Sequence, residues 1–250
     1  MRKYELTKET KTLADGMVLH RVRALMDISR YGVKAGDLGG WIEKYDNLSQ
    51  DGDAWVYGDA KIFDNANVFD NAKVSGDATV YGDAWVYGNA WVSGDATVYG
   101  DACVSGNAYV LDNARVYGDA CVSGNAMVFG DADVYGDAWV SGNTKVYGNA
   151  CVLGDDQVSG DARVFGNALV SGKTDYMTFK NSWSSGRWFT YTRSNRMWKV
   201  GCFHGTGEEL IEKAYADSEL SGKCYEAIVR AVETIEAAKA KAKGESNGRK

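Results

Sequence analysis

The sequence contains no proline and only two histidines, and both shortages restrict what the chain can be. Without proline, every backbone N–H is available to a hydrogen-bonded ladder of strands. With only His20 and His204, a single chain cannot supply a zinc site of three histidines. Regular β structure is therefore favoured, and one common class of metal centre is excluded.

Long apolar runs and paired cysteine motifs are also missing. No segment approaches the roughly 18 apolar residues that a membrane helix needs, and residues 1–11 are polar and charged. The five cysteines form no C-x-x-C motif and have an odd count, which is typical of free thiols in a reducing compartment. We therefore expect a cytoplasmic protein with no membrane partner.

Positive charge is scarce in the middle of the chain. Residues 53–172 contain 16 acidic and 5 basic residues, whereas residues 173–250 contain 14 basic and 10 acidic residues. Because like charge repels phosphate, we expect no nucleic-acid binding along the acidic segment.

This acidic segment, called the shaft below, repeats the unit A-x-V-x-G-[D/N] twenty times without insertion or deletion. Nineteen of the twenty central aliphatic residues are valine, and the other is Ile62. A hexapeptide period is typical of a parallel β-helix. A second period of 18 residues is visible in the Asn residues at positions 71, 89, 107, 125 and 143. Three hexads therefore form one coil, which predicts a triangular β-helix of about 6–7 coils, roughly 32 Å long at ~4.8 Å per layer.

Alternation within each hexad separates the inside from the outside. Ala and Val lie two positions apart and face the core, whereas the residue between them faces solvent. Gly and the following Asp or Asn turn the chain at each corner, because glycine allows unusual backbone angles and Asx side chains accept nearby N–H groups.

These hexads resemble those of the left-handed β-helix proteins of the hexapeptide-repeat superfamily. The wording "VYGDAWVYGNA" is similar to YdcK-like proteins and to repeat proteins of phages and prophages, and the flanks at residues 36–56 and 186–215 resemble the ends of the phage-type proteins. The resemblance implies a single-stranded left-handed helix, a phage or prophage origin, and a trimer, which is usual in the superfamily. It implies no settled activity.

The two ends of the chain differ from the shaft. Residues 1–52 are expected to form an N-terminal β cap, with a strand over 17–25 and a turn at "GDLGGW" (36–41), since an open coil would leave unpaired strand edges. Residues 173–250 are expected to form a small α+β module. Three short strands are predicted at "DYMTFK", "RWFTYTR" and "MWKVGCF". A helix begins after Thr206, where Glu209 completes a capping box, and extends to about Asp217, and a second helix covers about 223–243.

Acyl transfer is the reaction to consider for a hexapeptide-repeat protein. The resemblance implies a histidine base and a loop that projects from the coils to bind the acyl donor. Both histidines lie outside the coils and no insertion interrupts the hexads, so a structural role is favoured for each and no catalytic residue or cofactor is assigned. A CoA-dependent acyltransferase with a histidine from a cap remains an alternative.

One corner of the coil has a ladder of carboxylates that could recruit calcium. Because Asn replaces Asp freely at the same turn position, capping of turn N–H groups is favoured over metal binding, and no metal ligand is assigned. The ladder consists of Asp83, Asp101, Asp119, Asp137 and Asp155.

Outward-facing aromatic residues are the main candidates for a binding surface. An aromatic face on a thin shaft normally lies against another protein surface, so we expect self-association, with a foreign protein partner as the alternative. The shaft candidates are Trp55, Trp85, Trp91, Tyr109 and Trp139.

A segment of the module mixes basic and aromatic residues, as platforms for single-stranded nucleic acid do, although half-buried strands show the same pattern. Its candidates are Arg187, Trp188, Arg193, Arg196 and Trp198.

The sequence therefore predicts a non-catalytic binding or assembly protein that self-associates and engages a protein partner, possibly of the host in a counter-defence role. A second alternative to this function is a DNA mimic, in which the acidic shaft occupies a DNA-binding host protein.

Overall fold

The computed structural model describes residues 2–172 and 174–247, in two compact units, Met1–Tyr176 and Met177–Lys250. Each unit has a hydrophobic core of its own. Neither of the two helices in the described part of the chain is long and apolar enough to cross a membrane.

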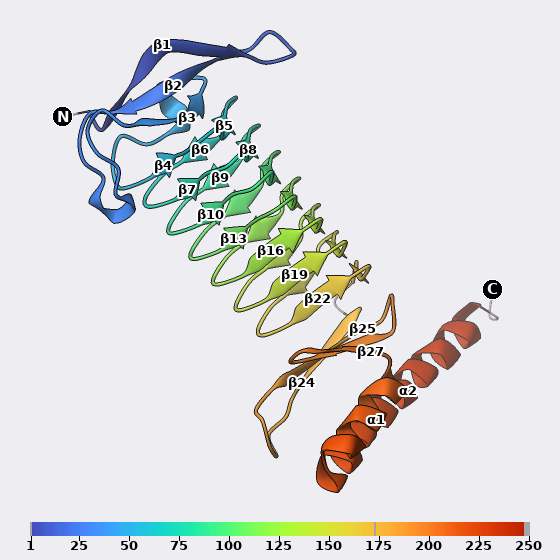
Figure 1. Cartoon of the computed structure of the whole chain (residues 1–250). Coiled ribbons are helices and arrows are strands. Elements are labelled where there is room, and N and C mark those ends of the chain that lie inside the picture. Colours follow the sequence, from blue (N-terminus) through green and yellow to red (C-terminus); the bar gives the residue numbers. More distant parts are fainter. Residues whose placement is uncertain (1, 173, 248–250) are drawn as a thin grey trace. The chain divides into compact units, whose positions relative to one another are not determined.

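The first unit is a parallel β-solenoid with three sheets, as the 18-residue period predicts (Figure 1). Each hexad contributes one short strand, and the strand 18 residues later lies beside it in register, as in the pair of Val98 and Val116. The first sheet contains, from the cap outward, β5 (Lys61–Ile62), β8 (Thr79–Val80), β11 (Thr97–Val98), β14 (Arg115–Val116), β17 (Asp133–Val134), β20 (Cys151–Val152) and β23 (Leu169–Val170).

The other two sheets follow the same step. The second sheet contains β4 (Trp55–Val56), β7 (Lys73–Val74), β10 (Trp91–Val92), β13 (Tyr109–Val110), β16 (Met127–Gly130), β19 (Lys145–Gly148) and β22 (Arg163–Gly166). The third sheet contains β6 (Asn67–Val68), β9 (Trp85–Val86), β12 (Cys103–Val104), β15 (Cys121–Val122), β18 (Trp139–Val140) and β21 (Gln157–Val158).

The core of the solenoid is as narrow as the hexad predicts. Every one of the twenty central Val and Ile side chains is fully buried, and the Ala positions two residues earlier are buried with them. Burying a valine stabilises the fold by roughly 1.5–3 kcal/mol, so the repeated Val column is the main source of stability along the shaft. Two residues depart from the Ala pattern, Thr144 and Asp156, and both are buried.

The corners use the left-handed backbone conformation. From Gly58 to Gly166, the glycines at this position have φ between 60° and 77°, as at Gly118 with φ 71°. Three hexads have Asp in place of this glycine, and Asp64, Asp70 and Asp112 adopt φ of 57–58°. Each of the three carboxylates accepts a hydrogen bond from the glycine N–H 18 residues later, at 3.1–3.2 Å. These bonds connect adjacent coils at the corners where glycine is absent.

The N-terminal segment caps the first coil, but it contains three strands where the sequence predicts one. β1 (Tyr4–Thr12) and β2 (Val18–Ala24) form an antiparallel hairpin, and β2 pairs with β3 (Leu38–Ile42). The predicted turn at "GDLGGW" is wrong, because β3 is a strand that pairs in parallel with β5. Two short 3-10 turns, η1 (Ser29–Tyr31) and η2 (Tyr45–Asn47), complete the segment.

Lys3 fastens the cap to the first coil. Its ammonium donates to the carbonyl oxygens of Asp51, Gly52 and Ala54 at 3.3, 3.2 and 2.9 Å. Burial lowers the pKa of Lys3 to about 8. The cap therefore satisfies backbone carbonyls that the end of a solenoid would otherwise leave unpaired.

The second unit is an α+β module. Its sheet contains β24 (Tyr176–Lys180), β25 (Trp188–Thr192), β26 (Met197–Val200) and β27 (Phe203–Gly205). The predicted single strand at "MWKVGCF" is two strands, because Gly201 has φ 56° and turns the chain into a hairpin. Helix α1 (Gly207–Asp217) has the predicted Thr206–Glu209 capping box, and α2 (Glu219–Asn247) begins four residues before the predicted start.

Candidate binding surfaces

The outer face of the third sheet contains the two most exposed tryptophans of the shaft. Trp85 is 54% exposed and Trp139 is 49% exposed. Three coils separate them, which is about 14 Å at ~4.8 Å per layer. The outward residues along this sheet, called the third-sheet face below, are all uncharged: Asn67, Trp85, Cys103, Cys121, Trp139 and Gln157.

Two free thiols lie between the tryptophans. Cys103 and Cys121 are register neighbours on β12 and β15. Burial and the adjacent Cys103 raise the pKa of Cys121 to about 11. A thiol with this pKa stays protonated at neutral pH and reacts slowly, so Cys121 extends the uncharged surface between Trp85 and Trp139.

The predicted carboxylate ladder borders this face at the corner that precedes each strand of the third sheet. Asp83, Asp101, Asp119, Asp137 and Asp155 are all exposed, and Asn65 donates to Asp83 at 3.0 Å. Within the described ranges, no group of three His, Cys, Asp or Glu side chains is arranged to hold a metal ion. The ladder gives the third-sheet face one strongly negative edge.

The predicted aromatic residues of the second sheet have different environments. Trp55, predicted to face solvent, is 1% exposed because the cap covers it, with the Tyr4 ring edge-on at 6.4 Å. Trp91 is half-buried and Tyr109 is exposed, and their ring centroids lie 6.0 Å apart. The prediction of an exposed aromatic column is therefore wrong at Trp55.

Trp91 and Tyr109 line a groove of about 510 Å³ beside η1, called the cap groove below. Arg30 and Tyr31 of η1 form one side, and Lys73 lies beneath them on β7. The other side is the Asn ladder, in which Asn89, Asn107 and Asn125 donate in turn to the next Asn of the ladder at 3.0–3.1 Å. The sequence reasoning missed Arg30 and Lys73, although Lys73 is one of only five basic residues in the shaft.

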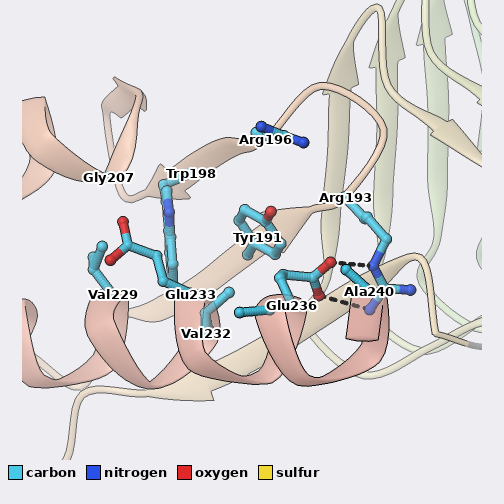
Figure 2. A pocket seen from close by; sticks show the side chains of 11 residues that line it. Tyr191, Arg193, Arg196, Trp198, Gly207, Val229, Val232, Glu233, Glu236 and Ala240 are labelled. Atoms are coloured by element: carbon cyan, nitrogen blue, oxygen red, sulfur yellow. Dashed lines mark hydrogen bonds and ion pairs between the residues drawn. The ribbon is translucent and has the colours of Figure 1, made fainter. Parts of the chain in front are cut away.

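The second unit has a pocket of about 520 Å³ between the β25–β26 hairpin and α2 (Figure 2). Arg193 pairs with Glu236 through two hydrogen bonds of 2.7 Å, and the Arg193 guanidinium lowers the pKa of Glu236. Tyr191 and Trp198 form its aromatic wall with ring centroids 5.1 Å apart. Arg196 lies on the hairpin turn with φ 54°.

The structure brings together only some of the predicted residues of the module. Arg193, Arg196 and Trp198 all line the pocket, but Trp198 is 2% exposed and belongs to the core, so its prediction as a surface residue is wrong. Arg187 and Trp188 lie outside the pocket lining, and the ammonium of Lys180 is 5.8 Å from the Trp188 ring centroid. A continuous stacking platform over residues 187–199 is therefore not formed by these side chains.

The two histidines occupy different units. His20 lies on β2 with its Nδ1 3.3 Å from the carbonyl oxygen of Thr7, and His204 lies on β27. A backbone contact of this kind orients an imidazole within a hairpin. The geometry at His20 fits the structural role that the sequence favours.

A family model matches the chain within the repeat. Residues 72–88 and 157–173 match the YdcK Beta solenoid repeat model. These two segments of the shaft are therefore similar to the YdcK Beta solenoid repeat. A comparison with curated protein sequences returned no match. The similarity covers two stretches of the repeat and says nothing of ligands.

Proposed function

We propose that this protein is a non-catalytic binding and assembly protein that associates with other copies of itself through the third-sheet face. The supporting observation is the pair of exposed tryptophans, Trp85 and Trp139, on a face whose outward residues are all uncharged. Interface cores are depleted in charge and enriched in aromatic residues. Covering about half of a Trp side chain stabilises an interface by about 2 kcal/mol.

The charges at the two edges of this face predict how self-association depends on salt concentration. One edge carries the exposed carboxylate ladder, and the other edge carries the uncharged Asn ladder. Copies that meet through this face bring their carboxylate ladders together, so salt should strengthen self-association by screening these like charges. A basic partner bound to the same carboxylates would instead dissociate as salt is raised.

The assembled protein would then engage a protein partner. The resemblance to phage and prophage repeat proteins supports a partner in the cytoplasm of a host cell and a counter-defence role. The trimer usual in the hexapeptide-repeat superfamily is the assembly that we favour.

The test is sedimentation velocity of the wild type and of a Trp85→Asp, Trp139→Asp double variant at low and high salt. We expect a wild-type oligomer that is more stable at high salt, and a monomeric double variant. Leu169→Asp is the matched control, since Leu169 is 44% exposed but lies on the first sheet. A monomeric wild type, or a double variant that assembles like the control, would contradict the proposal.

The alternatives give different outcomes in parallel measurements. Stoichiometric binding of a basic host protein that salt abolishes would support the DNA mimic. Saturable binding of acetyl-CoA that His20→Ala or His204→Ala removes would support the acyltransferase.

A further inference from the structure

The cap groove is a concavity whose wall is held by hydrogen bonds between the cap and the shaft. The side chain of Tyr31 donates to the backbone oxygen of Asn71, and the Tyr57 hydroxyl donates to the backbone oxygen of Tyr31 at 3.2 Å. Both bonds tie η1 to the second sheet, and burial raises the pKa of Tyr57 to about 12, so its hydroxyl stays a donor at neutral pH. The wall of the groove is therefore fixed in place before any ligand arrives.

The charge of the groove is opposite to that of the shaft. Of the described residues that line it, Arg30 and Lys73 are cationic and none is a carboxylate. Three aromatic rings surround the Lys73 ammonium, with centroids at 4.1 Å for Trp91, 4.9 Å for Tyr57 and 5.9 Å for Tyr31. Arg30 donates to Asn89 Oδ1 at 2.8 Å. These two cations favour an anionic ligand at this end of the groove.

The Asn ladder supplies paired donors and acceptors. A side-chain amide has two N–H donors and an oxygen with two lone pairs. At Asn107 and Asn125 the ladder uses one N–H and one lone pair, which leaves one of each facing solvent. The amides repeat at ~4.8 Å, the strand spacing, so they offer an evenly spaced row of donor–acceptor pairs. Hydroxyl groups on successive sugar rings need this kind of partner.

Trp91 and Tyr109 provide an apolar platform beside the amides. Their rings are tilted at 48° to each other, and Trp91 Nε1 is already bonded to Ser75 Oγ at 2.9 Å. Trp91 therefore contributes ring surface rather than a hydrogen-bonding group, whereas Tyr109 contributes a ring and a hydroxyl. An aromatic face packs well against the C–H face of a sugar ring.

We propose that the cap groove binds an acidic oligosaccharide, a short sugar chain that bears carboxylate groups and lies along the shaft. Its carboxylate faces Arg30 and Lys73, its hydroxyls bond to Asn107 and Asn125, and its ring faces pack on Trp91 and Tyr109. The aromatic platform of this site lies on the second sheet, and the site shares the Asn ladder with one edge of the third-sheet face. A nucleotide is the alternative ligand for these cations, and the AMP probe below tests it.

The test is isothermal titration calorimetry of the full chain with trigalacturonic acid, a hyaluronan tetrasaccharide and 3′-sialyllactose as acidic probes. Maltotriose, citrate and AMP are the matched neutral, non-sugar and nucleotide probes. We expect at least one acidic sugar to bind in a 1:1 ratio to each chain, and the three other probes to bind about tenfold or more weakly, or not at all.

Two variants locate the site. Lys73→Met keeps the apolar stem and removes the charge, and Asn107→Asp adds a like charge at a position where the last coil naturally has Asp161. Each should weaken binding about tenfold, the effect of about 1.4 kcal/mol. Asn149→Asp is the control, since Asn149 lies at another corner of the coil, where its side-chain amide donates to Asn167 at 3.3 Å. Thermal unfolding of each variant verifies that it is folded.

Three outcomes would overturn the inference. The first is that none of the acidic sugars binds at millimolar concentration. The second is that citrate or AMP binds as tightly as the best sugar, which would make the groove a general anion or nucleotide site. The third is that Asn149→Asp weakens binding as much as Asn107→Asp.

Discussion

At the scale of single residues, corner glycines meet two demands at once. They adopt a backbone angle that other residues reach at a cost of about 1–2 kcal/mol, and they pack against the backbone of the adjacent coil. A Cβ on Gly118 would lie 3.0 Å from the nitrogen of Gly136, whereas a Cβ on Gly160 would meet nothing within 4 Å. The two positions have nearly the same φ, 71° and 73°.

This pair separates backbone strain from packing. Gly160→Ala should cost only the backbone strain, about 1–2 kcal/mol, and Gly118→Ala should cost more because the next coil must shift. The measurement is chemical denaturation of both variants beside the wild type. Equal losses of stability would show that the stacked corner can relax at no cost.

At the scale of elements, the shaft could be predicted almost completely because every hexad has the same surroundings. Val98 meets Val80 and Val116, which sit at the same position of their own hexads. The cap could not be predicted in this way. The burial of Trp55 depends on Tyr4, and the strand at residues 38–42 depends on pairing with β5, and neither contact leaves a periodic signal.

The candidate surfaces show the same contrast between residues placed by the hexad and residues placed by long-range contacts. Trp85 and Trp139 could be predicted as exposed because the hexad places them outward. Arg30 could not be assigned to a groove, because a 3-10 turn of the cap brings it beside Asn89, 59 residues later in the chain. The split between β26 and β27 required knowledge of the backbone angle at Gly201.

The Arg193–Glu236 pair should make the module sensitive to acid. The folded-state pKa of Glu236 is lowered, so its stabilising contribution is present above the unfolded pKa of ~4.3 and is lost as the pH falls through the folded value. We expect the wild type to lose up to about 1 kcal/mol from this pair between pH 5 and the acid limit. Glu236→Gln should lack this part of the pH dependence.

Thermal unfolding of the module from pH 6 down to pH 3 measures the effect, with Glu212→Gln as the control on α1. Glu212 is exposed. A Glu236→Gln profile that parallels the wild type at every pH would contradict the assignment.

At the scale of the whole molecule, two separate cores predict two unfolding transitions. The first core is built from Val and Ala of the coils, and the second from larger side chains such as Phe189, Trp198 and Leu210. Differential scanning calorimetry should therefore resolve two transitions, one for each compact unit.

Val98→Asp assigns the transitions. An unpaired carboxylate at this fully buried position costs several kcal/mol, so the shaft transition should disappear or shift strongly while the module transition stays. Thr97→Asp is the control, since Thr97 faces outward beside Arg115 on the next strand. If Val98→Asp left both transitions in place, the assignment of inside and outside along the hexads would be reversed.

The uninterrupted hexads make the length of the shaft a countable quantity. Each added set of 18 residues places one more strand on each sheet at ~4.8 Å, and its neighbours above and below present the same Val, Ala and Gly surfaces as before. Duplication or loss of one coil in the coding sequence would thus change the length of the shaft by a fixed amount, and the core residues of the other coils would stay the same. The number of repeats therefore sets the length of the shaft, and proteins built on this repeat could set the distance between their binding surfaces by repeat number alone.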